Sequence, residues 1–141
     1  MRLVLDTNIV LDLLVFRDPA MAPVAAGLAD GSFEWLATAT MREELARVLA
    51  YPKLAPRVGL ARGDALAVLA DFDRLARVVP PPGRAPLTCG DADDQKFIDL
   101  AVAERCVLLS KDADVLRMAK RLGRLEVTAA SGLTGFRTTS Q

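Results

Sequence analysis

Four acidic residues stand where predicted strands and helices begin or end: Asp6, Glu44, Asp94 and Asp112. Carboxylate oxygens are preferred ligands of hard divalent cations. The chain has no histidine, which removes the commonest zinc ligand and excludes Ser-His-Asp and Cys-His catalysis. If the four carboxylates converge, they predict an oxygen-lined site for one or two Mg²⁺ or Mn²⁺ ions.

Asp6 and Asp112 each follow a short apolar run and precede a predicted helix, Asp6 directly and Asp112 after Ser110 and Lys111. The runs are Leu3-Val4-Leu5 and Val107-Leu108-Leu109. In a parallel sheet the carboxyl ends of the strands share one edge, so these two acids are expected to lie near each other. Aspartate is also a preferred N-cap residue, and that role is compatible with holding a metal.

Helical geometry separates the neighbouring acids Glu43 and Glu44. The segment Thr40-Met41-Arg42-Glu43 matches a capping box, which assigns Glu43 to the start of a helix. Glu44 then lies at the border of the apolar face centred on Leu45. We therefore expect Glu44, rather than Glu43, to lean into a site.

Asp94 falls on the apolar face of a helix predicted over residues 91–105. A carboxylate there needs a cation or hydrogen-bond donors, because burial disfavours its charged form. Asp91 is better explained as the N-cap and Asp93 as favourable charge near the helix N-terminus. Asp99 is expected to point away from this face into solvent.

The remaining pattern alternates strands with helices, which predicts an α/β fold around a parallel sheet. The predicted strands and helices cover residues 2–5, 7–16, 19–29, 34–37, 40–50, 62–76, 77–79, 91–105, 106–109, 113–122 and 125–128. Residues 80–86 read as a stiff connector. The 141 residues suit one domain over 1–141, with regular structure over about 2–128 and a flexible tail after about 136.

Composition bears on the partners and the cellular location expected for the protein. The 18 basic and 18 acidic residues cancel, so net charge alone demands no nucleic-acid partner. Cys89 and Cys106 lie far apart, without metal-binding spacing, and are expected to be reduced thiols. No signal peptide is evident, and no apolar run approaches the roughly 18 residues of a membrane span. These features predict a cytoplasmic protein that does not enter a membrane.

Four segments of the chain together resemble the PIN-domain family, a nuclease fold of bacterial toxins and RNA-processing enzymes. They are LDTNI at 5–9, REELARVLAYPK at 42–53, DADDQKFIDLAVA at 91–103 and LLSKDADVL at 108–116. The resemblance implies a three-layer αβα sandwich with a central parallel sheet of about five strands. It also implies metal-dependent cleavage of RNA, with the chain acting as the VapC-like toxin of a toxin-antitoxin pair.

The resemblance also implies roles for particular residues. Asp6, Glu44, Asp94 and Asp112 match the four acids of the family in order, with Asp6 and Asp94 holding the principal Mg²⁺ or Mn²⁺ ion. Supporting or substrate-orienting roles go to Asn8, Thr7, Ser110 and Asp91. The implied partners are an RNA substrate and a separately encoded antitoxin, and a homodimer is compatible with the family.

Two other functions compete with a ribonuclease. One is a PIN module that binds RNA or an antitoxin without cleaving anything. The other is an aspartyl-phosphate phosphatase, because Leu3-Val4-Leu5-Asp6 also resembles the start of that family. Its pattern wants a second aspartate two residues after the nucleophile, where this chain has Asn8.

Overall fold

Five short parallel strands form one sheet in the computed structural model, which describes residues 1–133. Their order across the sheet is β3-β2-β1-β4-β5. The strands are β1 (Arg2–Leu5), β2 (Glu34–Ala37), β3 (Ala76–Val78), β4 (Val107–Leu109) and β5 (Thr128–Ala130). The expected parallel sheet of about five strands is confirmed. The predicted tail after residue 136 lies outside the described residues.

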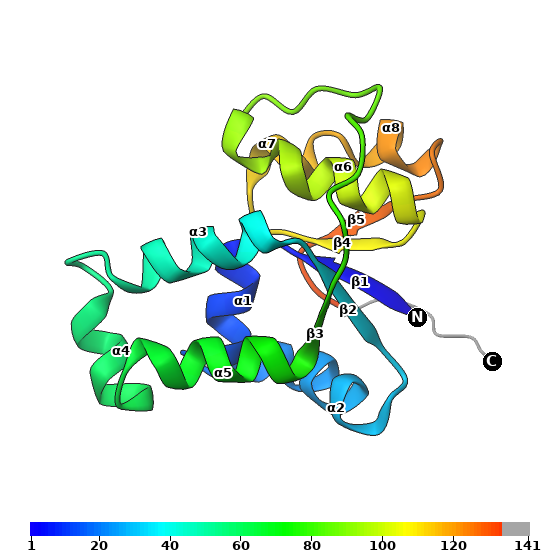
Figure 1. The fold of residues 1–141 in the computed structure, drawn as a ribbon. Helices are drawn as coiled ribbons and strands as arrows, with labels where there is room; N and C mark the ends of the chain where they lie inside the picture. Colours follow the sequence, from blue (N-terminus) through cyan, green and yellow to red (C-terminus); the bar gives the residue numbers. More distant parts are fainter. Residues whose placement is uncertain (134–141) are drawn as a thin grey trace.

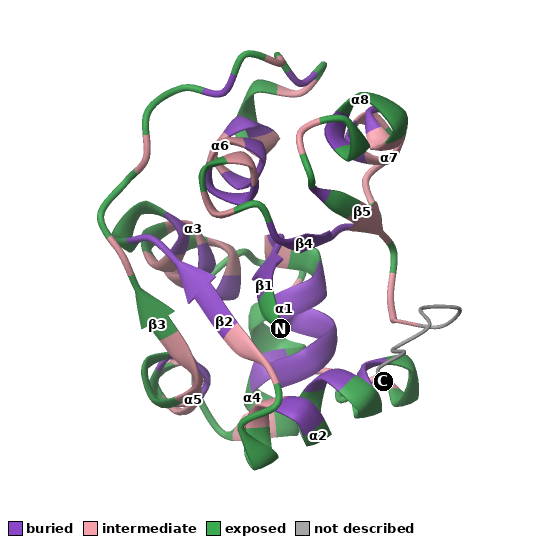
Figure 2. Cartoon of the chain, turned by 90° about the vertical axis from the view of Figure 1, so that its right-hand side faces the viewer, coloured by how far each residue is buried: buried purple, intermediate pink, exposed green. Residues whose placement is uncertain are grey.

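The helices cover both faces of this sheet. Helices α6 and α8 lie on one face of the sheet, and α1, α2 and α5 lie on the opposite face (Figures 1 and 2). The helices are α1 (Thr7–Leu14), α2 (Ala22–Asp30), α3 (Ala39–Leu49), α4 (Ala55–Arg62), α5 (Ala65–Leu75), α6 (Gln95–Glu104), α7 (Ala113–Leu116) and α8 (Ala119–Gly123), with 3₁₀ turns η1 (Pro19–Met21) and η2 (Ala92–Asp94). The three-layer αβα sandwich is confirmed.

Strands β1 and β4 lie side by side in the middle of the sheet. They pair with Leu5 opposite Leu109, and the side chains of Leu3, Val4 and Leu108 are fully buried. Strands buried on both faces read as continuous apolar runs rather than as alternating patterns. This explains why continuous apolar runs in the sequence predict both strands.

The chain changes direction across the sheet between these two strands. From β1 it steps to β2 and β3 on one side, and it returns to β4 and steps to β5 on the other. In open α/β sheets, ligands bind outside the carboxyl ends of the strands at such a switch point. In this chain those two strand ends are followed by Asp6 and Ser110.

The start of α3 differs from the expected capping box. Thr38, in an extended conformation, is the N-cap of α3, and its side chain makes no capping hydrogen bond, so Thr40 and Glu43 lie inside the helix. The Thr38 carbonyl accepts from the amides of Met41 and Arg42 at 3.1 and 3.2 Å. The chain turns as soon as buried β2 ends at Ala37, so the sheet sets the helix start and the local motif does not.

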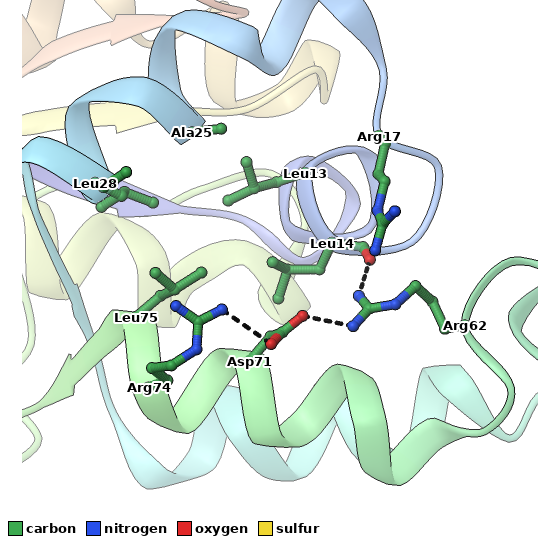
Figure 3. Close-up of a pocket in the computed structure, with 10 residues that line it drawn as sticks. Leu13, Leu14, Arg17, Ala25, Leu28, Arg62, Asp71, Arg74 and Leu75 are labelled. Atoms are coloured by element: carbon green, nitrogen blue, oxygen red, sulfur yellow. Dashed lines mark hydrogen bonds and ion pairs between the residues drawn. The ribbon is translucent and has the colours of Figure 1, made fainter.

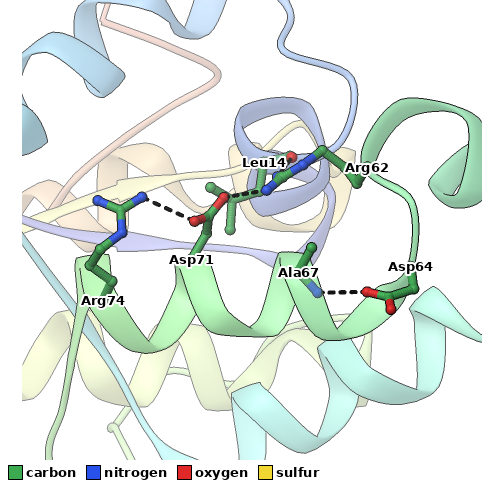
Figure 4. A network of polar contacts seen from close by, with 6 residues as sticks. All are labelled: Leu14, Arg62, Asp64, Ala67, Asp71 and Arg74. Atoms are coloured by element: carbon green, nitrogen blue, oxygen red, sulfur yellow. Dashed lines mark hydrogen bonds and ion pairs between the residues drawn. The ribbon is translucent and has the colours of Figure 1, made fainter.

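Helix α4 was not expected from the sequence, because its apolar residues do not gather on one face. A polar network fixes it instead (Figure 4). Arg62, at the end of α4, donates to the Leu14 carbonyl and to Asp71 Oδ2, both at 2.5 Å. Arg74 donates to the other Asp71 oxygen at 3.0 Å. The network ties α4 and α5 to the end of α1.

Among the described residues, no helix has both the length and the apolar character that crossing a membrane requires.

Candidate metal centre

Three carboxylates gather at the carboxyl edge of the sheet: Asp91, Asp94 and Asp112. One oxygen from each lies within 4.8 Å of the others, and all three side chains are half-buried. Asp91 is the N-cap of the 3₁₀ turn η2 and Asp94 is its last residue, directly before α6, whereas Asp112 precedes α7. We call these three residues the acid group.

Each carboxylate of the acid group has one oxygen that is not used in a helix-cap hydrogen bond and could bind a cation. Asp91 Oδ1 accepts from the Asp93 amide at 2.9 Å, and Asp112 Oδ1 accepts from the Asp114 amide at 2.7 Å. Both residues are therefore N-caps, and each cap bond occupies one carboxylate oxygen. Asp94 Oδ2 is buried and has no hydrogen-bond partner. An unpartnered, buried carboxylate oxygen fits a ligand of a hard cation.

The electrostatics of Asp94 support the same interpretation. The pKa of Asp94 is raised to about 7, first by burial and then by the nearby carboxylate of Asp112, with smaller effects from Asp91 and Asp6. Desolvation and like charge both disfavour the ionised form. A divalent cation would compensate both effects, so the donor set fits Mg²⁺ or Mn²⁺.

Asp6 is not a member of the acid group, but it is linked to Asp112 through the side chain of Ser110. Its Oδ1 accepts from the Ile9 amide at 2.9 Å, and its Oδ2 accepts from the Ser110 hydroxyl at 2.5 Å. Ser110 Oγ in turn accepts from the Asp112 amide at 3.0 Å. Burial raises the pKa of the Asp6 carboxyl, against the opposing effect of the Ser110 and Ile9 hydrogen bonds. Its contact with the acid group runs through Ser110.

Glu44 is paired with a lysine. Its Oε1 is buried and lies 2.8 Å from Lys96 Nζ, although this contact lacks hydrogen-bond geometry, and only 20% of the Glu44 side chain is exposed. Lys96 also donates to the Asp93 carbonyl. Glu43 is exposed, as the helical wheel predicted, although the capping box did not form. Within residues 1–133, Glu44 is not part of the acid group.

The sequence model of the PIN-domain family matches residues 2–114 of the chain. The chain belongs to the PIN-domain family. Domains of this family are generally metal-dependent nucleases, and the matched region contains all three members of the acid group as well as Asp6 and Glu44. A search of curated proteins found no match to the chain.

Two other acidic residues near the acid group form ion pairs with basic side chains. Lys111 Nζ lies 2.5 Å from Asp12 Oδ2, and Arg117 lies 2.5 Å from Asp114 Oδ1. Among the ion pairs found in the described part of the chain, none involves a member of the acid group. The group therefore carries uncompensated negative charge.

The supporting residues expected from the sequence have different surroundings. Thr7 is half-buried and Asn8 is exposed, both in the first turn of α1. Ser110 is fully buried between Asp6 and Asp112. Asp93, expected to supply favourable charge near a helix N-terminus, is exposed and lies outside the acid group.

Sequence reasoning missed the residues that surround the carboxylates. The expectation that Asp99 is solvated was wrong: its Oδ1 accepts from the Ala85 amide and from Gln95 Nε2, both at 2.8 Å. The four-residue spacing of Gln95 and Asp99 was the available signal, since such pairs face each other on a helix. Nothing in the sequence marked Lys96 as the partner of Glu44.

The PIN domain also has a pocket of about 230 Å³ away from the acid group (Figure 3). Leucines from α1, α2 and α5 form much of its wall, and Arg62 and Arg74 lie beside Asp71 at its edge. Its lining includes no member of the acid group. The pocket lies near the end of α1, whereas Asp6 caps the start of that helix.

Proposed function

We propose that this PIN domain is a Mg²⁺- or Mn²⁺-dependent endoribonuclease that acts as the toxin of a toxin-antitoxin pair. The observation that carries the proposal is the buried, unpartnered Oδ2 of Asp94 beside Asp91 and Asp112. Carboxylates held together without a paired cation are suited to a divalent ion. The proposed substrate is RNA, because the family resemblance pairs this site with RNA cleavage.

The residues of the chain divide the proposed work among them. Asp91, Asp94 and Asp112 would hold the ion, which supplies a water of lowered pKa and neutralises charge on the phosphoryl group. Asp6 and Ser110 fix the chain at Asp112 through their hydrogen bonds. A direct catalytic role for Asp6 or Glu44 is an expectation that the same experiments would test.

The proposal extends to location and partners. We expect a cytoplasmic protein that a separately encoded antitoxin inhibits, and that forms a homodimer in solution. Light scattering coupled to size exclusion would test the dimer, and a monomer at assay concentrations would contradict it.

The number of metal ions is a separate question. The ratio of bound Mn²⁺ to protein would distinguish one ion from two.

The decisive test combines Mn²⁺ binding with RNA cleavage. We expect wild-type protein to cleave RNA with Mn²⁺ and to lose this activity in EDTA. Asp94→Asn should weaken Mn²⁺ binding by more than about tenfold and reduce cleavage by about a hundredfold or more. Asp64→Asn is a matched control, because Asp64 caps α5 outside the acid group and asparagine is also a good cap.

Full cleavage by the double variant Asp6→Asn, Asp94→Asn would contradict the site assignment. Mn²⁺ binding without cleavage of any RNA would instead favour the non-catalytic module. A phosphoryl-enzyme adduct trapped on Asp6 would favour the phosphatase.

A further inference from the structure

The loop between β3 and α6 brings Asp91 to the acid group, and two side chains of α6 hold this loop. Gln95 Oε1 accepts from the Cys89 amide at 2.7 Å, and Gln95 Nε2 donates to the Leu87 carbonyl at 2.9 Å. Asp99 Oδ1 accepts from Gln95 Nε2 and from the Ala85 amide. These contacts join one turn of helix to three backbone groups between residues 85 and 89.

The contacts are sheltered from water, which makes them costly to lose. Gln95 is 9% exposed, and Cys89 and Ala85 are 5% and 8% exposed. A buried amide or carbonyl left without a partner costs about 1–3 kcal/mol. The loop therefore has little freedom to leave α6 while Gln95 and Asp99 are in place.

The other side of the loop rests on α7. A Cβ added at Gly90 would lie 3.2 Å from Asp114 Oδ1, and Arg117 forms an ion pair with that same oxygen at 2.5 Å. The segment just before Asp91 is thus confined between α6 and α7. Asp112 precedes α7, so the same two helices set the separation of Asp91 from Asp112.

We propose that Gln95, held by Asp99, is a positioning residue that fixes Asp91 within the metal-binding acid group. Asp91 follows Cys89 and Gly90 directly in the chain, so the path of these two residues helps to set where the Asp91 carboxylate lies. Residues that hydrogen-bond directly to a metal ligand commonly alter metal affinity by about 10- to 100-fold when they are removed, and Gln95 acts one step further away, through the loop, so we expect an effect at the low end of this range. This inference rests on the proposed metal-dependent function, and it adds a residue that touches neither the metal nor the substrate.

The test is the dissociation constant for Mn²⁺, measured from the electron paramagnetic resonance signal of unbound Mn²⁺. Gln95→Leu keeps much of the side-chain volume and removes all three hydrogen bonds. We expect its dissociation constant to rise about tenfold. Hydrogen exchange at the Cys89 amide should accelerate in the same variant. Unchanged Mn²⁺ affinity in folded Gln95→Leu protein would overturn the proposal.

Asp99 provides a second route if Gln95→Leu fails to fold. Asp99→Ala removes the acceptor of the Ala85 amide and should weaken Mn²⁺ binding. Asp99→Asn retains the Oδ1 acceptor and should restore most of the affinity, a rescue that the loss of charge alone would not give. Equal Mn²⁺ affinity in Asp99→Ala and wild type would contradict the positioning role.

Two glycines of the same loop give a matched steric comparison. Gly90→Ala would press on Asp114, whereas a Cβ at Gly83 meets nothing within 4 Å. We expect weaker Mn²⁺ binding only in Gly90→Ala, and equal binding by both variants would oppose the proposal. Failure of the wild type itself to bind Mn²⁺ would instead overturn the proposed function, so the two failures are distinguishable.

Discussion

The Ser110 hydroxyl donates a hydrogen bond to Asp6 Oδ2, although the two residues lie 104 positions apart in the chain. The same hydroxyl oxygen accepts from the amide of Asp112. One buried side chain thus connects the carboxylate at the end of β1 with the first residue of the turn into α7. This connection is possible because β1 and β4 are neighbours in the sheet.

Replacing Ser110 with alanine should destabilise the metal-free protein by about 1–3 kcal/mol, because the buried Asp6 carboxylate loses a donor. Urea unfolding at pH 7.5 would measure the change. Ser131→Ala provides the control, since Ser131 is exposed, and it should change stability by less than about 0.5 kcal/mol. Equal midpoints for the two variants would show that the Ser110 bond contributes no stability.

The raised pKa of Asp94 predicts how stability depends on pH without metal. The pKa is about 7 in the folded protein against an ordinary value of 3.8, so the folded state holds the proton over a range in which the unfolded state has released it. Stability should therefore fall as pH rises from about 4 to 7 and level off above. Thermal unfolding in EDTA would show this, and Asp94→Asn should flatten the slope.

Metal binding should follow the same titration. Because the bound ion requires ionised carboxylates, Mn²⁺ binding should release protons below about pH 7 and weaken as pH falls. Calorimetry in buffers of different ionisation enthalpy would count the protons. The absence of proton release at pH 6 would contradict the raised pKa of Asp94.

The Glu44–Lys96 pair should make a measurable contribution to stability, since its side chains are only 20% and 24% exposed. Lys96→Gln should be destabilising because Glu44 loses its cation. Glu44→Gln in the same chain should recover part of the loss, with a coupling energy of about 1 kcal/mol in a double-mutant cycle. Strictly additive effects would indicate that the pair is a surface contact without energetic coupling.

Arg62 and Arg74 bind the same carboxylate, Asp71, but differ in burial. The Arg62 side chain is 10% exposed, whereas that of Arg74 is 66% exposed. Arg62→Met should cost about 2–4 kcal/mol, because it leaves the Leu14 carbonyl and Asp71 without a donor. Arg74→Met should cost less than about 1 kcal/mol. Similar losses in urea unfolding would refute this interpretation of the network.

The local character of several elements explains how they could be read from the sequence. The buried strands β1 and β4 correspond to unbroken apolar runs in the sequence. The alternation of predicted strands and helices indicates a parallel sheet. Asp6, Asp91 and Asp112 are caps, a role set by bonds to residues two or three positions away. Helix α4 and the start of α3 escaped prediction, because packing rather than local pattern fixes them.

The sequence by itself determined which chemistry is available: carboxylates without histidine, placed at the ends of strands and the starts of helices. Only the tertiary structure decided which carboxylates meet. It grouped Asp91 with Asp94 and Asp112, set Asp6 behind Ser110 and paired Glu44 with Lys96. Caps and strand runs depend on neighbours in the chain, whereas distances between oxygens depend on strand order and on how the loop from β3 is held against α6.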